Sequence, residues 1–202
     1  MQLYNVPTSP YGRKVMVAAH ETGTLAQLDI RRTRPSETDH DLRERNPLGK
    51  IPTLITDDGM VLFDSPVICE YLDSLHDGHK LFPAAGPARW QALRQQAEAD
   101  GVLDAAILRR TESNRREELR SKAWIGHQTA AMHRALAHLE ADADTLTGAP
   151  TIGHVAIGCM LGYLDFRFPE EDWRGLAANL SDWYAGFSQR PSMQATVPSD
   201  QA

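Results

Sequence analysis

The stretch "TSPYGRKV", residues 8–15, lies where a short strand is expected to turn into a helix. The apolar run "QLYNV" before it is suited to a buried strand. After it, Tyr11, Val15 and Ala19 share one helical face, and Gly23 is a typical helix stop. A strand followed directly by a helix predicts the beginning of an α/β domain.

The segments that follow continue this alternation as far as residue 77. "LDIRR" has the alternation of a strand, "DLRER" predicts a short helix, and "TLITDDGMVLF" predicts a hairpin. "DSPVICEYLDSL" predicts a helix with Ser65 as its N-cap and Pro66 as its first residue. The order strand, helix, strand, helix, strand, strand, helix is typical of a thioredoxin-like domain.

A linker rich in glycine and proline follows at residues 78–87, and residues 88–202 have the pattern of helices throughout. Trp90, Leu93 and Leu108 belong to one expected apolar helix face. "HVAIGCMLGYLDF" is apolar on nearly all sides, which predicts a buried central helix. The fold class predicted is therefore α/β plus all-α.

The composition is that of a globular protein, with 42% hydrophobic and 24% charged residues among 202. A formal net charge of -6 argues against nucleic acid or an anionic membrane as a partner. The sequence shows neither a signal peptide nor a membrane-spanning run, so a cytoplasmic location is expected. Cys69 and Cys159 lie in apolar helical patterns and are expected to be buried and reduced.

Four segments, taken in this order and spacing, resemble motifs of the cytosolic glutathione S-transferase family. They are "TSPYGRKV" at 8–15, "NPLGKIPTL" at 46–54, "FDSPVICEYL" at 63–72 and "RPSMQAT" at 190–196. The resemblance covers essentially the whole chain, and the first motif is most similar to that of serine-using bacterial members. It implies a thioredoxin-like glutathione-binding domain at residues 1–77, an all-helical domain at 88–202, and a homodimer.

The second motif contains a proline directly before an expected strand, which suits a strand start. The resemblance implies that Pro52 is a cis-proline and that the backbone N–H and C=O of Ile51 face outward. In the family, these groups pair with the cysteinyl part of glutathione as an added strand does. Lys50 is a candidate for binding the glycyl carboxylate, although an exposed lysine is commonly just solvated.

The third motif places Asp64 and Ser65 at the start of a helix. A helix N-terminus favours a carboxylate, Ser65 adds a hydroxyl, and Asp64 can accept from an amine. The γ-glutamyl group of glutathione has both an α-carboxylate and an α-ammonium. The pair is therefore expected to bind glutathione, although an ordinary helix cap would have the same residues.

The centre of the first motif, Ser9-Pro10-Tyr11-Gly12, is similar to the Cys-Pro-Tyr-Cys of glutaredoxins with both thiols replaced. Thiol–disulfide exchange through residue 9 is thereby excluded. The thiol of glutathione has a reference pKa of about 8.5, and a hydroxyl donor at a helix N-terminus favours its thiolate. Ser9 is the expected catalytic residue. Thr8 and Tyr11 are rival hydroxyls, and Tyr11 is assigned instead to the second-substrate pocket.

The resemblance implies a glutathione transferase, in which bound glutathione thiolate attacks a small electrophile. Glutathione is then a co-substrate, no other cofactor is expected, and Arg109 is a further candidate for the second-substrate pocket. Peroxidase, dehalogenase and isomerase reactions begin from the same thiolate and stay open. A non-catalytic module that binds other proteins also stays open, although its glutathione motifs should be eroded.

The start of the expected central helix departs from the family pattern. Many members have a Ser or Thr cap followed three residues later by Asp, whereas here Thr151 is followed by His154. The acidic half of the capping box is therefore expected to be missing. No second histidine or acidic residue lies at helical spacing from His154, so a structural role is expected and a metal site is not.

Overall fold

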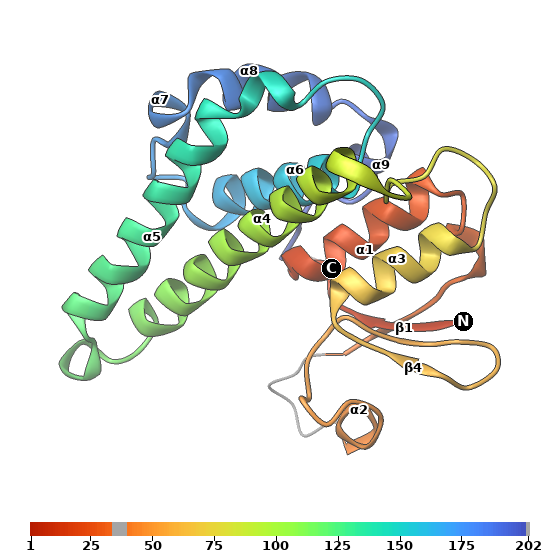
Figure 1. Ribbon diagram of the computed structural model, residues 1–202. Helices are drawn as coiled ribbons and strands as arrows, with labels where there is room; N and C mark the ends of the chain where they lie inside the picture. Colours follow the sequence, from red (N-terminus) through yellow and green to blue (C-terminus); the bar gives the residue numbers. More distant parts are fainter. Residues whose placement is uncertain (34–39, 201–202) are drawn as a thin grey trace. The chain divides into compact units, whose positions relative to one another are not determined.

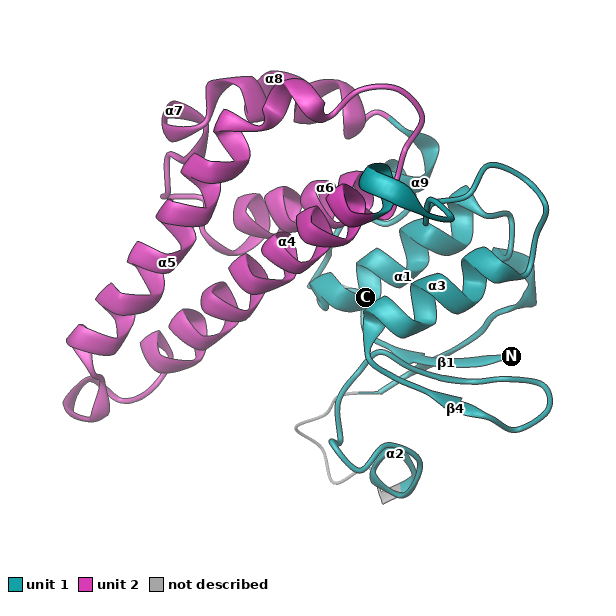
Figure 2. Ribbon diagram, viewed as in Figure 1, with its two compact units in different colours: residues 1–89, 190–202 teal, residues 90–189 magenta. Residues whose placement is uncertain are grey.

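The computed structural model describes residues 1–33 and 40–200 and divides the chain into two compact units. Unit 1 comprises Met1–Arg89 together with Arg190–Ala202, and unit 2 comprises Trp90–Gln189 (Figure 2). The closing segment of the chain therefore belongs with the first 89 residues. This differs from the expected boundary, which assigned all of residues 88–202 to a helical domain.

Unit 1 contains a four-stranded mixed sheet in the order β2-β1-β3-β4. The strands are β1 (Gln2–Asn5), β2 (Asp29–Arg32), β3 (Thr53–Ile55) and β4 (Val61–Leu62). β2 runs parallel to β1, β3 runs antiparallel to β1, and β4 runs antiparallel to β3. This topology confirms the predicted thioredoxin-like domain.

Two helices of unit 1, α1 (Pro10–Glu21) and α3 (Ser65–Ser74), lie side by side on one face of the sheet (Figure 1). Helix α1 ends where expected, because Gly23 follows its C-cap with a φ of +70° that glycine adopts readily. Both helices bury aliphatic side chains, and Cys69 is buried and free. The apolar face expected for α3 is confirmed at Ile68 and Leu72, which are buried, and wrong at Val67 and Leu75, which are exposed.

The short helix α2 (His40–Arg45) lies away from α1 and α3 in unit 1 (Figure 1). The buried side chain of Tyr4 in β1 donates its hydroxyl to the carboxylate of Asp41 in α2, and Arg31 pairs with the same carboxylate. The hydrogen bond from Tyr4 is the main reason why the pKa of Asp41 is lowered. These contacts tie α2 to the sheet.

The closing motif packs on α1 through α9 (Pro191–Gln194). Glu21, at the end of α1, accepts two hydrogen bonds from Arg190, at 2.9 and 2.7 Å, and one from Ser192. Burial by itself raises the pKa of Glu21, but the hydrogen bonds from Arg190 and Ser192 outweigh it, so the pKa lies below its usual value. This ion pair explains why residues 190–202 belong to unit 1.

Unit 2 is helical, as predicted. Its main helices, with the first beginning at the end of unit 1, are α4 (Gly86–Ser113), α5 (Lys122–Ala141), α6 (Ile152–Arg167), α7 (Trp173–Leu176) and α8 (Ala178–Phe187). Every residue of α6 from Ile152 to Leu164 is buried, including the free Cys159, which confirms the predicted central helix. No described helix is both long and apolar enough to cross a membrane.

The expected apolar face of α4 is wrong. Trp90 is 67% exposed and Leu108 is 45% exposed, whereas the buried positions include Ala99, Val102 and Leu103. Large apolar residues suggested the inner face from the sequence, but alanines and the polar Gln95 and Gln96 share it with Val102 and Leu103 in the structure. Side-chain size and polarity therefore did not indicate which face of α4 is buried.

The start of α6 also corrects an expectation. The backbone N–H of Thr151 donates to Nδ1 of His154 at 3.2 Å, and the hydroxyl of Thr151 lies 2.8 Å from the same nitrogen. The imidazole thus takes the place of the missing carboxylate in the capping box. His154 is buried beside Trp183 and Phe187, in agreement with its expected structural role.

The ion pair between Glu21 and Arg190 predicts an acid-dependent loss of stability. A carboxyl whose pKa is lowered in the folded state contributes stability above its unfolded pKa of about 4.3, and loses it as the pH falls through the folded value. Glu21→Gln should lower the free energy of unfolding at pH 7 by about 1–2 kcal/mol. Urea unfolding at pH 7 and pH 4 measures this, and the deficit should shrink at the lower pH.

Glu118→Gln is the matched control, because Glu118 faces Arg116 at 3.4 Å with both side chains well exposed. It should leave stability within a few tenths of a kcal/mol of the wild type. If Glu21→Gln behaves as this control does, the pair does not fasten the closing segment.

Candidate functional site

The sheet brings three distant motifs to one of its ends. Tyr4, near the end of β1, is the register partner of Thr53, at the start of β3. Leu62, at the end of β4, pairs with Leu54. The turn after β1, the segment before β3 and the segment after β4 therefore share one end of the sheet. These segments contain Ser9, Ile51-Pro52 and Asp64-Ser65 respectively.

Ser9 is the N-cap of α1. Its backbone is extended, with φ -80° and ψ 121°, and its Oγ accepts from the backbone N–H of Gly12 at 3.1 Å. Because Oγ accepts in this bond, the hydroxyl proton stays available for donation to another atom. The side chain is half-buried at the positive end of the helix dipole. The arrangement can donate one hydrogen bond to an anion placed at the start of α1.

The rival hydroxyls occupy different positions. Thr8 lies in the turn that precedes the helix, outside its first turn of hydrogen bonds. Tyr11 lies in the first turn of α1, and its ring centre is 5.9 Å from Nζ of Lys14. Both side chains are half-buried. Ser9 alone among the three is the N-cap.

Gly12 was not singled out from the sequence as a site residue. A Cβ added at Gly12 would lie 1.7 Å from Oδ1 of Asn5, at the end of β1, so any other residue here requires the buried side chain of Asn5 to move. The isolated glycine in a helical pattern was the signal for this close approach.

The peptide bond between Ile51 and Pro52 is cis, as the resemblance implied. The loop before it is braced by Asn46, whose Nδ2 donates to the carbonyl of Lys50 at 3.1 Å and to Oγ1 of Thr53 at 2.9 Å. In the described part of the chain, neither the N–H nor the C=O of Ile51 has a hydrogen-bond partner. The side chain of Lys50 is exposed. A free N–H and C=O on one residue can pair with an extended peptide.

Helix α3 begins one residue earlier than predicted. Asp64 is its N-cap, and its carboxylate accepts from the backbone N–H of Ser65, which is the first helical residue. Pro66 therefore occupies the second position. Ser65 is fully buried, and its Oγ has no hydrogen-bond partner among the described residues. The peptide bond between Phe63 and Asp64 is cis.

Arg109 lies in unit 2 near the end of α4. Its Nη2 donates to the carboxylate of Glu171, and its guanidinium lies 4.8 Å from the ring centre of Phe168. This hydrogen bond is the main reason why the pKa of Glu171 is lowered. The charge of Arg109 is thus paired within unit 2. In residues 1–33 and 40–200, no group of three or more His, Cys, Asp or Glu side chains could bind a metal ion.

Comparisons with known proteins agree with this geometry. The model of the glutathione S-transferase N-terminal domain matches residues 8–75, and that of the C-terminal domain matches residues 117–186. The chain is 30% identical over 201 residues to the uncharacterized GST-like protein YibF of Escherichia coli (strain K12), covering 98% of both proteins. The chain therefore belongs to the glutathione S-transferase family.

Solved structures extend the comparison. A glutathione transferase family member from Pseudomonas fluorescens Pf-5, with bound glutathione, is 45% identical, with a TM-score of 0.95 over 98% of each chain. Another structure from that organism, with bound S-(propanoic acid)-glutathione, is 44% identical and has a TM-score of 0.91, covering 98% of this chain and all of the other. The predicted fold, thioredoxin-like and then helical, is confirmed.

The two serines of the site should respond differently to the loss of their hydroxyls. Ser9→Ala removes an N-cap acceptor and should lower the free energy of unfolding by about 1 kcal/mol. Ser65→Ala removes a buried hydroxyl that has no partner in residues 1–33 and 40–200, so stability should stay within about 0.5 kcal/mol of the wild type or rise. Thermal or urea unfolding of the ligand-free proteins measures both. Equal losses would contradict the different environments assigned to the two serines.

Proposed function

We propose that the protein is a serine-type glutathione transferase that binds glutathione at the described sheet end and keeps its thiol ionised through Ser9. The observation that supports this most is that the N–H and C=O of Ile51 have no partner among the described residues, at the sheet end shared with Ser9 and Asp64-Ser65. An extended peptide that adds to a sheet edge pairs with such groups. Glutathione is a short peptide with a carboxylate at each end, so it can pair with Ile51 in this way.

Each end of glutathione has a chemical match in unit 1. The γ-glutamyl carboxylate meets the N-terminus of α3 and the hydroxyl of Ser65, which no described residue pairs. Asp64 is exposed and can accept from the γ-glutamyl ammonium. The exposed Lys50 can reach the glycyl carboxylate at the other end. The cysteinyl residue between them pairs with Ile51 and directs its sulfur toward the start of α1.

Ser9 then acts on the sulfur. Its hydroxyl proton donates to the thiolate, while its oxygen stays bonded to the N–H of Gly12. Each unit by which the thiol pKa falls corresponds to about 1.4 kcal/mol of preference for the anion. The thiolate attacks an electrophilic carbon and forms a C–S bond, and either a leaving group departs with its electron pair or the adduct takes up a proton. Tyr11 and residues of unit 2, Arg109 among them, are proposed for the second substrate.

Calorimetry with glutathione, together with thiolate absorbance followed against pH, tests the proposal. Ser9→Ala should bind glutathione but raise the pKa of the bound thiol by about one unit, because one hydrogen bond to the anion is lost. Ser65→Ala should weaken binding about tenfold and leave the thiol pKa unchanged. A thiol pKa that is the same in Ser9→Ala and wild type would transfer the donor role to Thr8 or Tyr11.

Absence of glutathione binding by the folded wild type would refute the transferase proposal and favour a module that binds proteins. Normal binding and thiol ionisation without turnover of electrophiles would instead favour another glutathione-dependent reaction. The two results are distinguished by the same titrations.

We also propose a homodimer. Several large apolar side chains are exposed, including Met60 and Val67 at 46% each and Trp90 at 67%. The family resemblance implies this assembly, and exposed apolar side chains such as Val67 are candidates for contact with a second copy. Light scattering should give twice the chain mass of 22.4 kDa, and Val67→Glu should shift the protein toward the monomer. A monomeric wild type at micromolar concentration would contradict this assembly.

A further inference from the structure

The loop that leads into β3 contains a buried hydrogen-bond network centred on the carbonyl of Lys50. Oγ1 of Thr53, the first residue of β3, donates to this carbonyl at 2.8 Å, and Nδ2 of Asn46 donates to it at 3.1 Å. Nδ2 of Asn46 also donates to Oγ1 of Thr53 at 2.9 Å. Both side chains are buried, with Asn46 1% exposed and Thr53 0% exposed, so neither presents surface to a ligand.

The two side chains of this network use all their donors and acceptors. Oδ1 of Asn46 accepts from the backbone N–H of Leu48 at 2.9 Å, and the two hydrogens of Nδ2 go to Lys50 and Thr53. The hydroxyl of Thr53 donates one hydrogen bond and accepts one. A buried polar network in which every member is satisfied is rigid. The network therefore holds the carbonyl of Lys50 in one direction.

The carbonyl of Lys50 and the N–H of Ile51 belong to the same peptide group. The peptide bond between these two residues is trans. In a planar trans peptide the N–H points opposite to the C=O, so fixing one group fixes the other. The N–H of Ile51 is thus directed away from Asn46 and Thr53, and it has no hydrogen-bond partner in the described part of the chain.

We propose that Thr53, acting with Asn46, is a positioning residue that aims the N–H of Ile51 at the cysteinyl carbonyl of glutathione. This role rests on the proposed function, because it concerns the same tripeptide in the same site. The cysteinyl residue carries the sulfur, so a misdirected N–H also loosens the sulfur from Ser9. A threonine with a structural role alone would affect stability, and would leave the glutathione affinity and thiol pKa of the folded protein unchanged.

Calorimetry with glutathione, and thiolate absorbance followed against pH, test this role in the full chain. Thr53→Val keeps the shape of the side chain and removes the hydroxyl. It should bind glutathione about tenfold more weakly and raise the pKa of the bound thiol toward that of free glutathione. Thr53→Ser retains the hydroxyl and should behave as wild type does in both measurements. If Thr53→Val does not fold, the smaller Thr53→Ala takes its place with the same expected losses.

A second ligand shows whether the loss acts through Ile51. γ-Glutamylmethylamide has both charges of the γ-glutamyl group and lacks the cysteinyl carbonyl, so no acceptor lies opposite the N–H of Ile51. Ligand-detected NMR should therefore give it the same affinity for wild type and Thr53→Val.

Thr22→Val is the matched control variant. Thr22 is 7% exposed, and its Oγ1 donates to the backbone carbonyl of Ala18 at 2.8 Å, at the other end of α1 from Ser9. The same chemical change is thus made in an equally buried threonine outside the site. Thr22→Val should lower the midpoint of thermal unfolding and leave the glutathione affinity and thiol pKa unchanged.

Three results overturn the positioning role. They are wild-type glutathione affinity and thiol pKa in Thr53→Val, an equal loss of affinity for γ-glutamylmethylamide, and the same losses in Thr53→Ser as in Thr53→Val. If wild type binds glutathione and Thr53→Val shows no loss, the proposed function stands and only the positioning role fails. If the folded wild type does not bind glutathione, both fail.

Discussion

The antiparallel pairing of β3 with β1 is the constraint on which the candidate site depends. In such a pair, the end of one strand lies opposite the start of the other. The register that joins Tyr4 to Thr53 therefore places the turn with Ser9 beside the segment with Ile51-Pro52. The return strand β4 adds Asp64-Ser65 at the same end. The pairing thus brings segments more than forty positions apart in the sequence to one end of the sheet.

Two helix starts at this end stabilise the structure and also carry the binding that we propose. A helix leaves its first N–H groups without internal partners, and a side-chain oxygen at the N-cap satisfies one of them. Ser9 does this for α1 and Asp64 does it for α3. Each cap still has capacity left, because the hydroxyl of Ser9 retains its proton and the carboxylate of Asp64 retains other lone pairs. Both N-termini also favour anions through the helix dipole.

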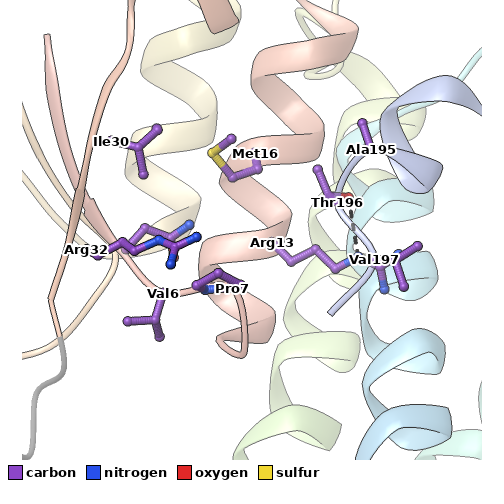
Figure 3. A pocket seen from close by; sticks show the side chains of 10 residues that line it. Val6, Pro7, Arg13, Met16, Ile30, Arg32, Ala195, Thr196 and Val197 are labelled. Atoms are coloured by element: carbon purple, nitrogen blue, oxygen red, sulfur yellow. Dashed lines mark hydrogen bonds between the residues drawn. The ribbon is translucent and has the colours of Figure 1, made fainter. Parts of the chain in front are cut away.

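The closing segment completes the first unit. Glu21 of α1 binds Arg190 and Ser192. Arg13, also in α1, binds Met193 and Thr196. Helix α1 is therefore bonded at two positions to the closing segment. These contacts also build one wall of a cavity of about 180 Å³ in unit 1 (Figure 3). The closing motif, which the sequence assigned to the end of the helical domain, thus belongs to unit 1.

The sequence by itself determined the order of elements in the first 77 residues, the buried helix α6 and the residue types of the site, because periodicity and turn residues are local signals. It also indicated Ser9, Ile51-Pro52 and Asp64-Ser65 as candidate site residues, because short sequence motifs contain them. Only the tertiary structure decided that Asp64 rather than Ser65 caps α3, that Trp90 faces outward on α4, and that His154 completes the cap of α6. It alone showed that, within the described part of the chain, the backbone N–H and C=O of Ile51 are not hydrogen-bonded. These features depend on which groups meet across long sequence distances, and local patterns do not contain that information.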